Sequence, residues 1–465
     1  MSLDWSRQTF HLLGLTIFLT IMFVVVTYLS GGKVSTIALF PLGSVLFFLL
    51  TSFELCSVVL VGSLFVDYHL GGFSSAVWFT LPFASSFLAR FREIEWKKLS
   101  NPMTTSILVY GVAVAPSFLN ATQPLENILR GLNVVAFIIV LYSMVAALQT
   151  YDHLRRVFAV YLALVCVNAL HVIIQSFAGE SRPFGFAGIM FVDYVSLGIC
   201  VTAAMSLVSV GKKRILPLLL MTLFVVSLIL TQTRSAWLAT AITLVILAGY
   251  VVLRPQVVGP SRRLLVIGIV VGSLSLVGIG TFVISMNPRV QQRATQLTRE
   301  PRYGFDEWGG VENSFFTRLL IWDTALNAFV SHPIVGIGVY GFPFSSKHYS
   351  KMPKLLYDRY VKGLSPHQTH LAVITETGII GALGFGIFLV TALVNAFRTI
   401  SRSTSRRGIE YSFVSAIAIV YCSVSMFFTD AWLWGQGIVL LGLVIGLVMA
   451  NLKISGAATA AEMGR

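Results

Sequence analysis

The feature that most constrains this chain is a series of apolar stretches that recurs from one end to the other. Each stretch has roughly 16–25 residues, about the length that a helix needs to cross the core of a bilayer. Only 11% of the 465 residues are charged and 56% are hydrophobic, a balance that a soluble domain of this length would not sustain. We therefore expect an all-α integral membrane protein.

The number of spans follows from where these stretches fall. The second and third stretches are short and turn-like, so we expect twelve to fourteen transmembrane helices. The stretches lie at approximately 9–29, 35–52, 55–70, 72–89, 103–119, 128–149, 157–177, 187–210, 215–231, 236–253, 264–286, 368–396, 411–429 and 436–451.

Basic residues collect in every second short connection between the predicted spans. The positive-inside rule makes these connections cytoplasmic and places both termini inside. Most of the net charge of +14 is thereby explained by topology, and no nucleic-acid partner is implied. The residues are Arg90, Arg92, Lys97, Lys98, Arg155, Arg156, Lys212, Lys213, Arg214, Arg254, Arg262, Arg263, Arg398, Arg402, Arg406 and Arg407.

One connection on the outer side, residues 288–366, is far longer than the others. Its ten basic and six acidic side chains do not contradict the orientation, because the rule weakens for loops longer than about 60 residues. We interpret it as an external functional loop. The expected organisation is an N-terminal transmembrane bundle at 1–287, the loop at 288–366 and C-terminal transmembrane helices at 367–465, all within one membrane domain.

Within the loop, apolar residues at spacings of four and three predict an amphipathic helix. Such a helix could lie on the outer membrane surface or close over the bundle. Arg318 projects from its first turn, beside the apolar stripe. The stripe consists of Phe315, Leu319, Trp322, Leu326 and Phe329.

Several familiar motifs are absent or misleading. No D-x-D, HExxH or P-loop pattern occurs, and the four cysteines all fall inside predicted spans, so neither a metal ion nor another cofactor is expected. Residues 336–341 match G-x-G-x-x-G, but no predicted strand precedes them. We interpret this segment as a turn that ends a helix.

His367 ends the long loop where an apolar, glycine-punctuated segment begins. A titratable imidazole at a membrane surface is a candidate for catalysis. Gln368 follows it directly, and His370 lies one helical turn further on, where packing or hydrogen bonding is the more typical role.

Two arginines lie at outer span ends, where the positive-inside rule would not place them. Arg234 interrupts two apolar spans, and Arg182 occupies the previous outer connection, where pairing with Glu180 is an equally good interpretation. Guanidinium groups at a membrane interface suit a lipid diphosphate, because they bind phosphate oxygens bidentately and stay charged. Asp430 ends the penultimate span, followed by Trp432 and Trp434, whose position is typical of an interfacial tryptophan belt.

Four segments together resemble the signature region of the O-antigen ligase and polymerase superfamily. They are Arg318-Leu-Leu-Ile-Trp322, His332-Pro333-Ile-Val-Gly336-Ile-Gly338, His367-Gln368-Thr369-His370-Leu371 and Glu376-Thr377-Gly378-Ile-Ile-Gly381. The resemblance covers roughly residues 310–390, and residues 231–235 match the arginine-bearing span end of the family. This chain has Gln368 where members usually carry asparagine after the histidine.

The resemblance implies a glycosyltransferase of the bacterial inner membrane with a C-type helical fold, whose active site faces the periplasm. The donor would be a glycan on undecaprenyl diphosphate. His367 would be catalytic, Arg234 and Arg318, together with Arg182, would bind the diphosphate, and Gln368, His370 and Asp430 would support them. Inversion at the anomeric carbon is expected, without a metal ion.

The acceptor does not follow from these residues. A ligase would use lipid A core, and a polymerase would use another lipid-linked glycan. We favour the ligase; a protein O-glycosylating member is a third alternative. A transporter or lipid flippase, the rival from another class, should place ionisable residues near the bilayer midplane and show internal repeats. The polar groups here gather at outer span ends instead.

Overall fold

A computed structural model describes residues 102–122, 124–180, 183–254, 314–403, 405–433 and 435–463, together with Val61, Leu64 and residues 69–70 and 73–74. Helices make up nearly all of it. They are α6 (Pro102–Val114), η2 (Ala115–Asn120), α7 (Pro124–Ala147), α8 (Tyr151–Phe177), η3 (Gly185–Met190), α9 (Phe191–Val208), η4 (Gly211–Arg214), α10 (Ile215–Leu230), α11 (Arg234–Leu253), α14 (Ser314–Ser331), α15 (Phe342–Tyr349), α16 (Lys354–Tyr360), α17 (Thr369–Arg402), α18 (Arg406–Ser425), η6 (Ala431–Leu433) and α19 (Gly435–Met463). Two-residue strands, β1 (His69–Leu70) and β2 (Phe73–Ser74), pair antiparallel.

The predicted membrane fold is confirmed. Among the described residues, eight helical segments are long and apolar enough to cross a membrane, and their bounds follow the predicted stretches between 103 and 451 closely. Peripheral helices leave large aliphatic side chains exposed, for example Val245 on α11 and Leu383 on α17, as surfaces that face lipid do. The predicted stretch at 128–149 forms α7. The total of twelve to fourteen spans stays a prediction, since most of the stretches before residue 90 and the stretch at 264–286 lie outside the described ranges.

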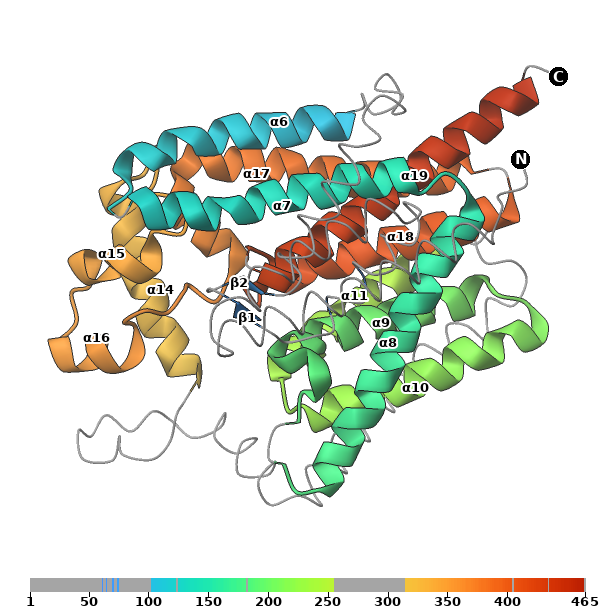
Figure 1. Cartoon of the computed structure of the whole chain (residues 1–465), viewed down its shortest axis with the longest axis horizontal. Coiled ribbons are helices and arrows are strands. Elements are labelled where there is room, and N and C mark those ends of the chain that lie inside the picture. The colour runs from blue at the N-terminus through green and yellow to red at the C-terminus, as the bar shows by residue number, and fades with distance from the viewer. Residues whose placement is uncertain are drawn as a thin grey trace, which may run out of the picture.

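The centre of the bundle is formed by α9, α18 and α19, most of whose residues are buried. In Figure 1, α6 runs beside α17 and α7 beside α19. The α7–α19 pair is close because Gly442 and Gly446 face it: a Cβ on Gly446 would lie 2.8 Å from the Met144 Cβ. The two glycines form a GxxxG pair, whose small residues allow close packing of helices in a membrane.

Within the described part of the chain, the basic connections meet at one end of the bundle, called here the basic end. Arg406 at the start of α18 donates a hydrogen bond to the carbonyl of Val208 at the end of α9. Arg407 lies 3.9 Å from Asp152 at the start of α8. Helix order then places the start of α17 and the end of α18 at the opposite end, called the loop end because α14, α15 and α16 lie there (Figure 1).

A break in α17 joins the loop helices to the bundle. Gly378 has a non-helical backbone with φ of +64°, which glycine adopts without the steric cost that other residues meet. The amide of Ile379 then donates to the Pro333 carbonyl at 2.8 Å, and the amide of Gly338 donates to the Glu376 carbonyl at 3.0 Å. The turn at 333–341 thus satisfies backbone groups that the break leaves unpaired.

The G-x-G-x-x-G segment lies in this turn, as expected, and serves close packing. A Cβ on Gly336 would lie 2.3 Å from the Glu376 carbonyl carbon, so only glycine permits this approach. Asn120 in η2 also donates a hydrogen bond to the Gly336 carbonyl at 2.8 Å.

The predicted loop helix exists as α14, and the face that it buries in the protein lies beside the predicted apolar stripe. Leu319 and Leu326 are 43% and 52% exposed, whereas Ile321, Ala325 and Ala328 are fully buried. These buried residues pack against α15 and the segment around α16, forming a second small core with Phe342, Tyr357 and Val361. Small side chains allow neighbouring helices to approach, so the alanine face is buried and the larger leucines face outward.

Candidate functional site

His367 has an unusual backbone that is fixed from two sides. Its φ is +53°, a left-handed conformation that costs a non-glycine residue roughly 1–2 kcal/mol and is concentrated at functional sites. On one side, the indole N–H of Trp322 donates to the Pro366 carbonyl at 3.0 Å. On the other, the Thr369 amide donates to the carbonyls of Met426 and Thr429. The position of the histidine is therefore set by α14 and by the α18–α19 connection.

Asp430 is the direct partner of His367. The His367 amide donates to Asp430 Oδ2 at 3.1 Å, and the ring Nδ1 lies 3.7 Å from Oδ1, an ion-pair distance rather than a hydrogen bond. The aspartate side chain is 8% exposed and the imidazole 41% exposed. Burial by itself would raise the pKa of Asp430, but interactions with His367 and Ser365 outweigh it and hold that pKa below its usual value.

Arg318 approaches the same aspartate from α14. Its Nη1 donates to the Phe428 carbonyl at 3.2 Å. Partial burial lowers the pKa of this guanidinium, and the negative charge of Asp430 opposes that shift. His367, Asp430 and Arg318 therefore form one electrostatic group, to which three separate parts of the chain contribute.

Arg234 lies at the same end of the bundle as His367. Tyr250, near the end of α11, packs against Phe413 near the start of α18 and against Phe397 near the end of α17. Because α11 therefore runs antiparallel to α18, its first residue, Arg234, points to the end where α18 finishes. The structure brings Arg234 to the loop end, as the sequence predicted.

Backbone strain gathers at this end of the bundle. Within the described ranges, three non-glycine residues have positive φ: Gln232, Tyr340 and His367. Gln232 lies two residues before Arg234. The hydroxyl of Tyr340 donates to the Leu433 carbonyl, and the Leu433 amide in turn donates to the Asp430 carbonyl. All three strained residues thus lie at the loop end, where the candidate site is, a signal that the sequence did not reveal.

The other predicted supporting residues differ in their placement. Gln368 precedes the first turn of α17 and makes no side-chain cap bond. The ring of His370 lies 4.3 Å from that of Phe427 and faces Phe385, and its buried Nε2 has no hydrogen-bond partner within the described residues. His370 is therefore packed among aromatic rings, in agreement with its expected packing role. Arg182 lies outside the described residues.

Trp432 is not part of an interfacial belt, which corrects the prediction made for it. It is fully buried and its ring meets that of Tyr421 edge-on at 6.2 Å. The α18–α19 connection folds into the bundle. Trp432, which the sequence places just after the end of a predicted span, is therefore buried inside the protein. Trp434 lies outside the described part of the chain.

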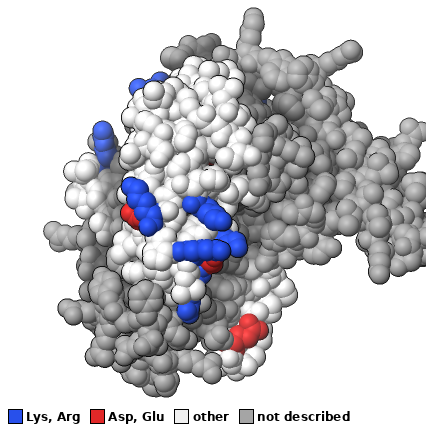
Figure 2. Space-filling model, turned by 90° about the vertical axis from the view of Figure 1, so that its left-hand side faces the viewer, with Lys and Arg blue, Asp and Glu red and all other residues white. Residues whose placement is uncertain are grey.

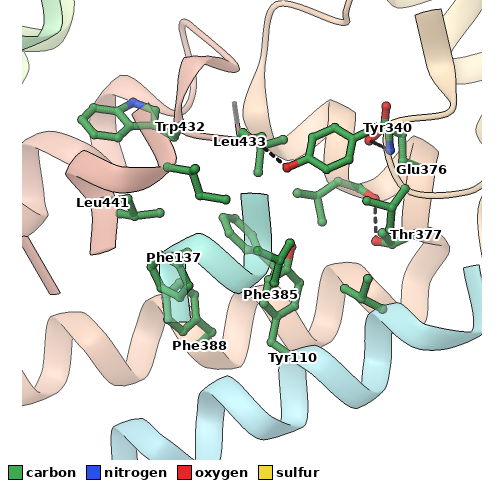
Figure 3. A pocket seen from close by; sticks show the side chains of 15 residues that line it. Tyr110, Phe137, Tyr340, Glu376, Thr377, Phe385, Phe388, Trp432, Leu433 and Leu441 are labelled. Carbon is green, nitrogen blue, oxygen red and sulfur yellow. Dashed lines mark hydrogen bonds between the residues drawn. The ribbon is translucent and has the colours of Figure 1, made fainter. Parts of the chain in front are cut away.

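Glu376 is a buried acid that the sequence analysis placed only within a motif. Its carboxylate accepts the amides of Tyr340 at 2.9 Å and Phe342 at 3.3 Å, at the entrance to α15. Figure 3 shows Tyr340 and Glu376 at one edge of a pocket whose other walls are aromatic and aliphatic side chains of α6, α7, α17 and α19. Leu433, three residues from Asp430, lines the same pocket.

Asp193 supports the site from the bundle side. Its carboxylate accepts hydrogen bonds from Tyr421 at 3.0 Å and Ser425 at 3.1 Å. Ser425 is the last residue of α18, so this buried contact fixes the start of the connection that carries Asp430. In the described residues, no three His, Cys, Asp or Glu side chains come together as a metal ion would need; metal-free chemistry stays a prediction.

Comparison with protein families gives a match over residues 216–386, to a family described as O-antigen ligase. This match confirms the predicted resemblance to the O-antigen ligase and polymerase superfamily. A comparison with curated proteins found no match.

The O-antigen ligase match covers less than half of the chain but includes the residues that the sequence singled out. Arg234, Arg318 and His367 all fall within it. Asp430, which the sequence suggested as a supporting residue, falls beyond its end, and the contact with His367 is seen in the structure. The chain therefore combines several helices that can span a membrane with a central region similar to the O-antigen ligase family.

Proposed function

We propose that this chain transfers a glycan from undecaprenyl diphosphate to a sugar hydroxyl of lipid A core, on the periplasmic face of the bacterial inner membrane. The observation that carries this proposal is the group formed by His367, Asp430 and Arg318 at the loop end, within and beside the O-antigen ligase match. It combines a base, an acid that orients it and a cation, as a displacement at an activated sugar requires.

His367 is the general base in this proposal. Asp430 faces Nδ1, which favours the tautomer with a proton on that nitrogen and leaves Nε2 to accept one. Nε2 takes the proton of the acceptor hydroxyl while the oxygen forms a bond to the anomeric carbon. The bond from that carbon to the diphosphate oxygen breaks in the same step. A single displacement from the opposite face inverts the anomeric configuration.

The arginines act on the leaving group. As the carbon–oxygen bond breaks, the lipid diphosphate gains negative charge, which Arg234 and Arg318 stabilise by charge-assisted hydrogen bonds. Arg182 is proposed to assist them. A diphosphate is already an activated leaving group, so the reaction proposed here uses no metal ion. The apolar walls of the pocket beside Leu433 suit the first part of the lipid carrier.

Removal of the protein from its host cell tests the proposal. Accumulation of finished glycan on undecaprenyl diphosphate, with lipid A core left unmodified, is expected of a ligase. Accumulation of single lipid-linked repeats would instead assign the chain as a polymerase, which has the same site chemistry and a different acceptor. Unchanged lipid-linked glycans and unchanged lipid A core would contradict both.

A further inference from the structure

The loop end carries a group of exposed cations that the proposed reaction does not use. The residues between Phe342 and Pro366 include five basic side chains and a single acidic one, Asp358. The basic side chains are all exposed, and together they are called the basic patch: Lys347, Lys351, Lys354, Arg359 and Lys362.

Membrane topology does not explain the basic patch. The positive-inside rule accounts for cations at the basic end, on the other side of the bundle. The connection at residues 426–433, which also lies at the loop end, contains no lysine or arginine. The positive charge is concentrated in one module, and its position calls for a binding role.

Ion pairs leave much of this charge available. Asp358 lies 3.7 Å from Lys362. For Lys347, Lys351 and Lys354 no acidic partner lies within ion-pair distance among the described residues. These three exposed ammonium groups can therefore bind an anion without breaking an ion pair within the described residues.

The patch is presented by a packed module. The hydroxyls of Ser346 on α15 and Tyr357 on α16 are 3.0 Å apart and buried. Tyr357 and Phe342 belong to the small core that includes Ile321 of α14. Because the backbone beneath the lysines is held in this way, their spacing is defined before any partner binds, which lowers the entropic cost of binding.

The basic patch lies at the end of the bundle, beyond the spanning helices. In Figure 1, α15 and α16 lie beyond the ends of α6, α7 and α17. Figure 2 views that end directly and shows lysine and arginine side chains gathered on it. The basic side chains are thus exposed at the end of the bundle rather than on the sides of its long apolar helices.

We propose that the basic patch binds an anionic glycan, a sugar chain whose carboxylate or phosphate groups pair with these lysines, and holds it for reaction at His367. The proposal rests on the glycosyl transfer proposed above. Lys362 precedes His367 by five residues, which an extended chain spans in at most roughly 18 Å. A glycan of several sugars can therefore touch the patch and the imidazole at once.

Binding is tested on the full-length protein in nanodiscs, with polygalacturonate as the anionic probe and dextran as the neutral one. Lys351→Glu with Lys354→Glu should weaken polygalacturonate binding roughly tenfold at low salt, from the loss of two exposed ion pairs and the repulsion that replaces them, and less at high salt. Lys351→Arg with Lys354→Arg should bind normally. The matched control, Lys212→Glu with Lys213→Glu, changes two exposed lysines of the basic end and should also bind normally.

Two results would overturn the proposal. One is equal polygalacturonate binding by all these variants. The other is a loss of binding to phosphatidylglycerol vesicles in the Lys351→Glu, Lys354→Glu protein with polygalacturonate binding intact, which would assign the patch to a membrane surface. His367→Ala should leave polygalacturonate binding unchanged, so the binding result stands even if glycosyl transfer fails.

Transfer assays identify which substrate carries the anionic glycan. A higher KM of the Lys351→Glu, Lys354→Glu protein for a charged donor, with a neutral acceptor, assigns the patch to the donor glycan. A higher KM for a phosphorylated acceptor, with a neutral donor, assigns it to the acceptor. A KM unchanged for both charged substrates would overturn a role of the patch in transfer.

Discussion

His367 and Asp430 meet through two contacts although 63 residues separate them in the chain. The amide of His367 donates to Oδ2 at 3.1 Å, and its ring Nδ1 lies 3.7 Å from Oδ1. The carboxylate therefore orients both the backbone and the ring of the residue proposed as general base. This makes Asp430 a positioning residue whose charge matters as well as its shape.

Asp430→Asn keeps one oxygen acceptor and removes the negative charge. Hydrogen bonds to charged groups contribute about 1.5–3 kcal/mol, so we expect transfer to fall about 10-fold to 150-fold, mainly in kcat. Rates at saturating donor and acceptor, compared at matched protein levels, give the measurement. Wild-type kcat in the asparagine variant would remove Asp430 from the site.

The pH dependence of the same variant follows from the lowered pKa of Asp430. A carboxyl group with a depressed pKa stabilises the fold above its ordinary pKa of about 3.9, and this contribution is lost as the pH falls through the lower folded value. Asp430 should therefore stay ionised between pH 5 and 8. Infrared difference spectra of wild type against Asp430→Asn should show an ionised carboxylate and no protonated carboxyl band over this range, and a protonated band above pH 5 would contradict this.

If Arg234 and Arg318 bind the diphosphate, replacing either with lysine should reduce glycan transfer. Lysine keeps the charge of Arg234 or Arg318 but loses the planar pair of donors. Alanine should reduce transfer about 10²-fold to 10³-fold, as loss of a group that stabilises transition-state charge does, with lysine intermediate. Donor binding and transfer in nanodiscs provide the readouts. Full activity in both lysine and both alanine variants would remove the arginines from the site.

Gly378→Ala should destabilise the protein, because φ is +64° and the new Cβ would lie 2.3 Å from the Ile334 carbonyl oxygen. The left-handed backbone alone costs about 1–2 kcal/mol. Gly386→Ala, in the same helix with nothing within 4 Å of the new Cβ, is the matched control. Thermal unfolding in detergent should show a lower midpoint for Gly378→Ala only. Equal midpoints would contradict the prediction and would mean that the turn at 333–341 can shift to accommodate the new Cβ at little cost.

The orientation is tested with single cysteines near Lys213 and near Lys351, in a protein whose four native cysteines are replaced. We expect a membrane-impermeant thiol reagent to label only the second in intact cells, because α15 and α16 are external in this account. Labelling near Lys213, or none near Lys351, would place the site on the cytoplasmic side and contradict the proposed periplasmic reaction.

Hydropathy was sufficient to predict the described spanning helices and the alternating direction in which they run. Each described span follows an apolar stretch, and strict alternation is what brings Arg234 to the end where His367 lies. The match between pattern and structure is close because a bilayer demands long apolar helices wherever the chain crosses it.

The contacts that form the site could not be predicted from sequence patterns. Periodicity predicted α14 and its apolar stripe, but it did not show that the small Ala325 and Ala328 would be buried in a core with α15 and α16. Asp430 was one of several polar residues at span ends, and its pairing with His367 depends on how the α18–α19 connection folds inward. The hydrogen bond from Trp322 to Pro366 likewise joins segments 44 residues apart.

The most direct test of this account is glycan transfer by His367→Ala, measured with undecaprenyl-diphosphate glycan and the purified full-length protein in nanodiscs. Loss of a positioned general base lowers rates by about 10²-fold to 10⁴-fold, and we expect a loss of that size with insertion and expression unchanged. His370→Ala is the control, because its ring packs against Phe427 and Phe385 and it should lose much less activity. Near-normal transfer by a stable His367→Ala protein would contradict the mechanism, and a larger loss in His370→Ala would move the catalytic role to His370.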